Sequence, residues 1–323
     1  MNFNKFSRTL SAIFLIPLLF SVISAQKSGR KNTEKSQQKV RTVTIPISIF
    51  TKKELRESQA EEFVQADRLI VEENGEEQTI LSIRSVTTTS LALAVLIQDD
   101  LSSEANLQLQ EVKKFIRALP KGTRVMVAYL RGGSLNVRQK FTDDLEKAAD
   151  SIRIIVGSPS VAPRSPFDGV NDTLERFDAL PTGRRAILLI SDGLDVSGGV
   201  RNSSPGQSID LDEAILGAQR RGVAVYSFYA SGSLTSSGNS QLINNGQSSL
   251  LKLSDETGGR AFFSGSFTAV SYEPYFRDLG LLLSRQFALT YLSTNLKKGY
   301  YKVKVTSTNP EVKIEHPKGY YYR

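Results

Sequence analysis

The sequence predicts an α/β protein, in which a doubly wound, mostly parallel sheet is flanked by a small β module made from the N- and C-terminal segments. In the middle of the chain, continuously apolar runs such as 91–97 and 186–191 alternate with segments of helical periodicity. This pattern is typical of strands that are buried on both faces and joined by helices. Near both ends, residues 42–50 and 300–306 alternate apolar and polar side chains, which indicates half-buried strands.

The N-terminus has the pattern of a secretory signal peptide over residues 1–25. Lys5 and Arg8 precede an apolar run over 10–22 that is too short to span a bilayer, and small residues follow it. A buried N-terminal helix is the alternative. Residues 26–41 are polar and basic, which predicts a flexible linker. We therefore expect an exported protein, periplasmic or secreted, with no membrane span once the signal is removed.

The composition argues against several classes of function. The 323 residues include no cysteine and one histidine, His316, which excludes disulfide frameworks and thiolate metal sites and leaves little room for histidine-based catalysis. The net charge of the chain is +8, and the first 41 residues, with eight basic side chains and one acidic one, account for +7 of it. Residues 42–323 therefore have a net charge of +1. A body with so little charge has no general attraction for nucleic acid. We expect His316 to be a surface residue.

Residues 42–88 are expected to form the N-terminal β module. The β-branched run 42–50 predicts a strand, and Pro46 within it predicts an edge position. Asn74-Gly75 separates the runs 68–71 and 77–83, which is the strongest short-range signal for a hairpin.

Residues 89–284 are expected to form the α/β domain, and residues 285–323 to add strands that pair with the N-terminal module. Within the domain, the apolar runs predict strands over 91–97, 125–130, 135–141, 186–191, 223–229 and 260–263. Helical spacing predicts helices over 104–119, 145–156, 167–180, 211–221 and 250–257, and the polar stretch 231–249 predicts a loop. The C-terminal strands are predicted over 286–292, 300–306 and 312–315.

Two acidic segments follow apolar strands of the domain. Asp99-Asp100-Leu101-Ser102-Ser103 comes after the strand 91–97, and Ser191-Asp192-Gly193-Leu194-Asp195 closes the strand 186–191. Ligands of open α/β sheets bind at the carboxyl ends of strands, and carboxylates with hydroxyls suit a divalent cation such as Mg²⁺. The ordinary alternatives are a helix N-cap at Ser102 or Ser103 and simple turns at Asp192 and Asp195.

These segments, in this order, resemble the von Willebrand factor type A domain, and most closely the exported bacterial proteins related to it. The resemblance rests on DDLSS and SDG after apolar strands, on RRGVAVYSFY and LSDETGGRAFF, and on the ending RQFALTYLSTN…KGYYKVKV…HPKGYYYR. It extends over residues 42–323. It implies a Rossmann-like sheet with a metal-ion-dependent adhesion site that holds Mg²⁺ or Mn²⁺, where a carboxylate of a protein ligand completes the metal shell.

Carried over by position, the resemblance implies a degenerate site. Its expected metal ligands are Asp99, Ser103, Ser165 and Asp192. Leu101 stands where the family has a serine, and Arg164 where it has a threonine. Two outcomes stay open: Ser165 and Ser102 complete a weak metal site, or the site is metal-free and Arg164 neutralises the two aspartates. The expected contacts to the partner are Asp100, Ser102, Arg164 and Asp195.

The leading functional prediction is a non-enzymatic module that binds a protein partner, since no nucleophile, base or cofactor fingerprint is present. One alternative is a Mg²⁺-dependent phosphoryl hydrolase that uses the same carboxylates, although Leu101 replaces the second acidic residue that such enzymes need. The other is a structural or assembly protein in which the site is vestigial.

Overall fold

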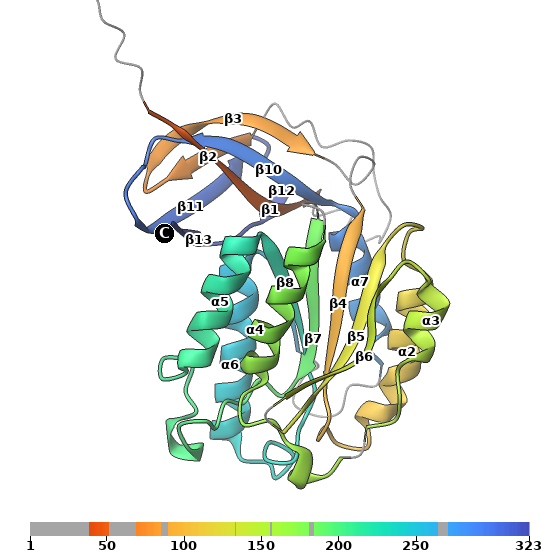
Figure 1. Cartoon of the computed structure of the whole chain (residues 1–323). Helices are drawn as coiled ribbons and strands as arrows, with labels where there is room; N and C mark the ends of the chain where they lie inside the picture. Colours follow the sequence, from red (N-terminus) through yellow and green to blue (C-terminus); the bar gives the residue numbers. More distant parts are fainter. Residues whose placement is uncertain are drawn as a thin grey trace, which may run out of the picture. The chain divides into compact units, whose positions relative to one another are not determined.

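Two β-sheets organise the chain, as Figure 1 shows. The computed structural model describes residues 39–51, 69–84, 90–132, 134–155, 157–180, 184–263 and 271–322. The predicted signal peptide and residues 26–38 of the predicted linker lie outside the described residues. Residues 39–323 form one compact unit, so the predicted domain boundaries at 88/89 and 284/285 stay predictions.

The six-stranded sheet has the order β6-β5-β4-β7-β8-β9. Its parallel strands are β4 (Leu91–Gln98), β5 (Arg124–Arg131), β7 (Arg184–Ser191), β8 (Val223–Tyr229) and β9 (Ala261–Phe262), and β6 (Ser134–Thr142) runs antiparallel at one edge. Numbered along the chain, the order is 3-2-1-4-5-6, which is that of a Rossmann-like doubly wound sheet. The prediction of a mostly parallel sheet is confirmed.

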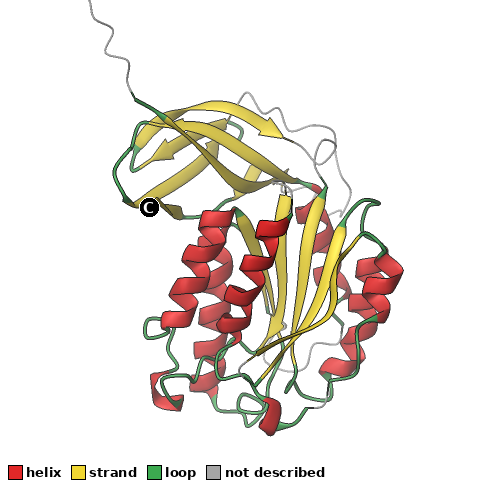
Figure 2. Ribbon diagram, viewed as in Figure 1, coloured by secondary structure: helices red, strands yellow, loops and turns green. Residues whose placement is uncertain are grey.

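Helices cover both faces of this sheet (Figure 2). One face packs on α2 (Ala105–Arg117), α3 (Leu145–Asp150) and α7 (Glu273–Ser284), and the other on α4 (Pro166–Arg176), α5 (Ile209–Arg221) and α6 (Ser240–Thr257). Within β4, Leu93 and Val95 face the first group, whereas Ala94 and Leu96 face the second. All eight residues of β4 are buried for this reason, and the strand is therefore apolar without alternation.

The seven-stranded sheet combines strands from both ends of the chain in the order β12-β1-β10-β3-β2-β11-β13, and its neighbouring strands are antiparallel. Its strands are β1 (Arg41–Thr51), β2 (Leu69–Glu73), β3 (Glu76–Arg84), β10 (Gln286–Ser293), β11 (Gly299–Ser307), β12 (Val312–Glu315) and β13 (Gly319–Tyr322). Asn74 and Gly75 have φ angles of 53° and 88°, as the predicted two-residue hairpin between β2 and β3 requires.

A buried carboxylate lies inside this sheet. Glu73 is fully buried and accepts hydrogen bonds from Tyr291 (2.8 Å), Tyr320 (2.7 Å), Ser293 (2.6 Å) and Asn295 (2.7 Å). Burial alone would raise the pKa of Glu73, but the four hydrogen bonds outweigh it and lower the pKa. The hydrogen bonds join β2 to β10 and β13 and to the residues that follow β10.

Some elements differ from the predictions. Residues 231–249 are not all loop, because α6 begins at Ser240, where the Asn239 side chain accepts from two backbone amides. The predicted helix over 145–156 ends at Asp150. Pro46 is not on an edge strand, since β1 lies between β10 and β12; however, β12 pairs only with 48–51, so Pro46 has a neighbouring strand on one side alone.

The two sheets contact each other through polar and aromatic groups. The Ser48 hydroxyl of β1 lies 3.2 Å from the Tyr226 hydroxyl of β8. Arg260 forms an ion pair of 2.6 Å with Glu315 of β12. Among the described residues, no helix has the length and apolarity needed to cross a membrane.

Candidate functional site

The two predicted acidic segments leave the sheet side by side. β4 and β7 are parallel neighbours with Ile97 opposite Ile190, so Asp99 and Asp192 follow at the same carboxyl edge. The side chain of Gln98 connects them: its Oε1 accepts from the Ser191 hydroxyl at 2.5 Å and from the Asp192 amide at 3.2 Å. We call this edge, with the loops that follow β4, β7 and β8 and the segment 151–165, the carboxyl rim.

Asp99 is paired with an arginine of its own chain. The Asp99 carboxylate is fully buried, and its Oδ2 accepts from Arg153 Nη2 at 2.5 Å, with Arg131 Nη1 at 3.6 Å. Tyr129 fixes Arg153, because the guanidinium lies 4.2 Å from the ring centroid and the Tyr129 hydroxyl accepts from the Arg153 amide at 2.9 Å. The negative charge of Asp99 is thus neutralised inside the fold.

Asp100 and Asp192 bind the loop that follows β8. Asp100 accepts from the Ser233 amide at 3.1 Å and the Ser233 hydroxyl at 2.6 Å. Asp192 Oδ2 accepts from the Thr235 hydroxyl at 3.3 Å. Gly232 is needed between them, since a Cβ atom there would lie 2.3 Å from Asp192 Oδ2. These carboxylates hold three loops of the carboxyl rim together.

The Asp192 carboxyl has an unusual proton affinity. Burial raises its pKa to about 7, and the nearby Asp100 adds to the increase. Hydrogen bonds from the Leu194 amide, Gln98 and Thr235 act in the opposite direction. Asp168, at the first turn of α4, also has a raised pKa, of about 6, because of burial and the neighbouring Asp210.

The remaining predicted residues have different surroundings. Ser165 is buried and caps α4 by accepting from the Phe167 amide at 3.3 Å. Ser102 is half-buried and Ser103 exposed. Asp195 is buried and accepts from the Ser197 amide at 2.9 Å and from the Ser208 hydroxyl. Arg164 is exposed, and its side chain makes no hydrogen bond or ion pair with the described residues. The expectation that Arg164 neutralises Asp99 is therefore wrong, because Arg153 forms that ion pair.

The side chains at the carboxyl rim do not fit the divalent ion that the resemblance implies. Leu101 is fully buried and supplies no oxygen. A guanidinium already occupies one oxygen of Asp99, and Asp99 and Asp192 are almost inaccessible to the waters that Mg²⁺ retains. The second carboxylate oxygen of Asp99, Oδ1, is buried and has no hydrogen-bond partner. Among the described residues, no group of three or more acidic or histidine side chains is placed to hold a metal ion.

Sequence reasoning missed the groups that neutralise and bind the carboxylates. Arg153 lies 54 residues from Asp99, in a segment predicted as a helix, and no motif links the two. Ser233 and Thr235 lie in the polar stretch that was predicted only as a loop. Gln98 carried a detectable signal, because it is a polar residue at the end of an otherwise apolar strand.

The carboxyl rim also exposes apolar side chains. The large hydrophobic residues exposed among the described residues number ten, and half of them lie in these loops or at the helix ends next to them: Leu107, Ile154, Val200, Ile209 and Leu234. These five side chains are exposed to solvent and are available for contact with another protein.

Comparisons with known proteins give matches at the level of structure only. No family model matches the chain, and neither does any curated protein. A von Willebrand factor type A protein from Catenulispora acidiphila matches with a TM-score of 0.46 and 10% identity over 88% of this chain and 74% of that one. The conserved hypothetical protein BatB from Bacteroides thetaiotaomicron matches with a TM-score of 0.42 and 12% identity over 60% of this chain and 98% of that one.

A third match is the manganese-loaded TRAP protein of Plasmodium vivax, with a TM-score of 0.40 and 10% identity over 77% of this chain and 97% of that one. Because these TM-scores are all below 0.5, we assign the fold from the strand order of this chain, β6-β5-β4-β7-β8-β9. It is the Rossmann-like order. This strand order confirms the Rossmann-like sheet that the resemblance to the von Willebrand factor type A domain implies.

Proposed function

We propose that the chain is an exported, non-enzymatic binding protein that contacts a protein partner through the carboxyl rim without a metal ion. The observation that carries the proposal is that Leu107, Ile154, Val200, Ile209 and Leu234 are exposed in the loops of the carboxyl rim or at the helix ends next to them. Apolar side chains in water are unfavourable for an isolated protein, and a partner that covers them gains hydrophobic free energy.

The charged groups at the carboxyl rim favour a partner with an exposed carboxylate. Arg164 is exposed and Arg131 is 46% exposed. Arg164 belongs to the segment 161–165, and Arg131 precedes Gly132, whose amide donates to the Val161 carbonyl of that segment at 2.9 Å. A guanidinium binds a carboxylate with two parallel hydrogen bonds. In this proposal a partner carboxylate meets arginine at the place where the resemblance implies a metal ion.

The arrangement favours a binding role over the phosphoryl hydrolase. A hydrolase would use Asp99 as its nucleophile, but that carboxylate is fully buried and its Oδ2 is bound to Arg153. A nucleophile needs access to its substrate. The alternative of a structural protein with a vestigial site shares the internal role of the carboxylates and differs in predicting no partner at the rim.

A capture experiment with matched variants tests the proposal. The purified chain is cross-linked in an extract of the source cells, beside a variant with Leu107, Ile154 and Leu234 changed to serine and a control variant with Leu251 and Leu296 changed to serine. Leu251 and Leu296 are 45% and 44% exposed and lie outside the carboxyl rim. We expect the same partner with the wild type and the control, and its loss with the rim variant.

Chelation distinguishes binding without a metal ion from binding that depends on a metal ion at Asp99. Capture in the presence of EDTA should equal capture in its absence, and titration of the chain with Mg²⁺ or Mn²⁺ should give no heat. Capture that needs the metal would show that Asp99 Oδ1 accepts an ion after all. Capture that survives in the rim variant would contradict the apolar contact itself.

A further inference from the structure

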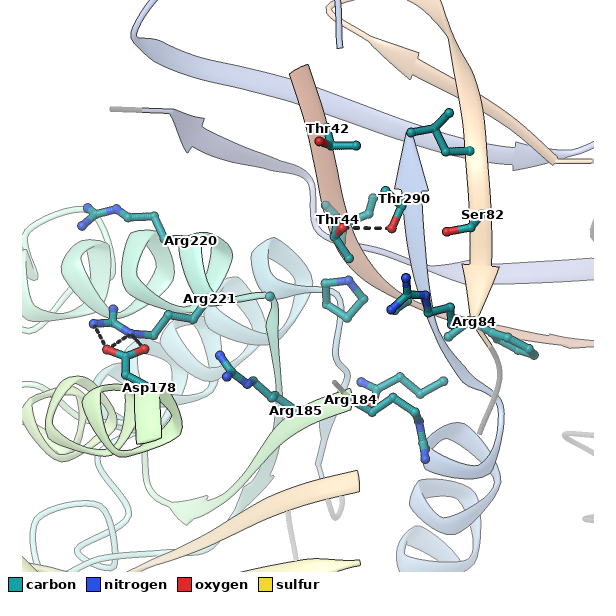
Figure 3. A pocket seen from close by; sticks show the side chains of 17 residues that line it. Thr42, Thr44, Ser82, Arg84, Asp178, Arg184, Arg185, Arg220, Arg221 and Thr290 are labelled. Carbon is teal, nitrogen blue, oxygen red and sulfur yellow. Dashed lines mark hydrogen bonds and ion pairs between the residues drawn. The ribbon is translucent and has the colours of Figure 1, made fainter. Parts of the chain in front are cut away.

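A basic cavity lies at the opposite end of β7 from the carboxyl rim. Its volume is about 800 Å³, and it separates the start of β7 from the face of the seven-stranded sheet (Figure 3). Thr44 of β1 and Thr290 of β10 lie on one wall and are hydrogen-bonded to each other at 2.9 Å. Arg184 and Arg185 of β7 lie on the facing wall. Volumes of roughly 300 to 1,000 Å³ are usual for cavities that bind small molecules.

The charge of the cavity is unbalanced. Five arginines line it, at positions 84, 184, 185, 220 and 221, and Asp178 is the only acid among the described residues that do so. Asp178 is bound by Arg221, whose Nε and Nη2 each donate at 3.0 Å. No carboxylate in the cavity is therefore left for Arg84, Arg184 or Arg185.

Two of these arginines are buried. Arg184 is 5% exposed and Arg185 is 8% exposed. Each donates one Nη2 bond to a backbone carbonyl, from Arg184 to Leu283 and from Arg185 to Leu180. The Nε atom of each is buried without a hydrogen-bond partner. Burial lowers the pKa of Arg184 to about 10, as expected for a cation with no counter-ion close by.

A third buried group in the cavity is incomplete. Gln286 is 1% exposed, and neither its Oε1 nor its Nε2 has a hydrogen-bond partner. Buried polar atoms are nearly always paired in folded proteins. Arg184, Arg185 and Gln286 therefore all line one cavity and all have unpaired polar atoms, and both guanidinium groups lack a full set of acceptors.

We propose that this cavity binds a small organic molecule with at least two negative charges, whose carboxylate or phosphoryl oxygens accept hydrogen bonds from Arg84, Arg184 and Arg185. Guanidinium groups are suited to both kinds of oxygen. The hydroxyls of Thr42, Thr44, Ser82 and Thr290 line the rest of the cavity and complement polar groups on the body of the ligand. The site is independent of the carboxyl rim, because Arg184 begins the strand that Asp192 follows.

Thermal-shift and calorimetric titrations of the full chain with pyrophosphate and with citrate test this site, against sodium chloride at equal ionic strength. We expect the unfolding temperature to rise with one or both anions and not with chloride. The anion that binds identifies the chemistry, phosphoryl or carboxylate. If neither anion stabilises the wild type beyond chloride, the proposal is wrong.

Three variants locate the binding. Arg84→Gln changes an exposed side chain, so its folding should be unaffected, and Arg185→Gln changes a buried one. Arg138→Gln is the control, since Arg138 is exposed on β6 and does not line the cavity. Both cavity variants should bind the anion roughly tenfold or more weakly, as the loss of a charged hydrogen bond predicts, and the control should bind as the wild type does. Binding that is unchanged in Arg84→Gln and Arg185→Gln would overturn the proposal.

Discussion

Arg153 donates to Asp99 at 2.5 Å and places a cation of the chain itself at the end of β4. Asp99 is fully buried, whereas the Arg153 side chain is 25% exposed and covers it from the solvent side. A buried carboxylate without a counter-charge is costly. The pair therefore holds the segment after α3 against the end of β4, and it gives the carboxyl rim its shape without an ion from solution.

Removal of the Arg153 charge should destabilise the fold. Arg153→Met leaves the buried Asp99 with only the more distant Arg131, at 3.6 Å, as a counter-charge, and we expect the free energy of unfolding to fall by up to about 3 to 5 kcal/mol. Urea denaturation measures it. Arg164→Met is the matched control, and because Arg164 is exposed, its effect should stay within about 0.5 kcal/mol. The double variant Arg153→Met with Asp99→Asn should recover part of the loss; a double variant as unstable as the single one would show that Asp99 is not the reason.

The outcome at Asp99 shows how far sequence alone could lead. The apolar runs predict β4 and β7, and their parallel pairing predicts that Asp99 and Asp192 share one edge. Arg153 was out of reach, because its contact depends on where the chain turns after α3, and that helix was predicted too long. The start of α6 was missed because most residues before Leu250 are polar, although Leu242, Gly246 and Ser249 are buried there.

The seven-stranded sheet should depend on the buried Glu73. Glu73→Ala removes a carboxylate that four side chains bind, and the donors left without an acceptor are buried or half-buried. We expect a loss of unfolding free energy on the order of 3 kcal/mol or more. Glu77→Ala changes an exposed glutamate of the same hairpin and should have little effect. Similar losses in the two variants would mean that the hairpin, and not the buried carboxylate, is what matters.

Asp192 should make the protein less stable as the pH rises. Its pKa is raised from 3.8 to about 7 by burial, so the unfolded chain releases this proton at lower pH than the folded one. The stabilisation from the buried, protonated carboxyl is complete below pH 3.8 and is lost as the pH rises to about 7. Asp192→Asn should therefore gain stability relative to the wild type across this interval, whereas the exposed Asp143→Asn should follow the wild type. A constant difference between Asp192→Asn and the wild type at every pH would contradict the raised pKa.

His316 should make the protein less stable as the pH falls, which is opposite to the effect of Asp192. The expectation of a surface histidine needs correction, because His316 is half-buried, its Nε2 accepts from the Val305 amide at 3.3 Å and its Nδ1 lies 2.9 Å from the Pro317 carbonyl oxygen. Burial lowers its pKa below the ordinary 6.5, against the opposing effect of the Pro317 carbonyl. Both hydrogen bonds fit the neutral ring with its proton on Nδ1.

The neutral His316 ring therefore contributes stability that is fully present above about pH 6.5 and is lost as the pH falls toward the lower pKa of the folded state. Because the chain has a single histidine, its imidazole proton resonances can be followed without assignment by mutation. We expect the NMR titration midpoint to lie below 6.5 in the folded protein and to return to the ordinary value in urea. His316→Gln should remove the part of the acid destabilisation that begins near pH 6.5, and a folded-state midpoint at or above 6.5 would show that the ring is charged and the Val305 contact broken.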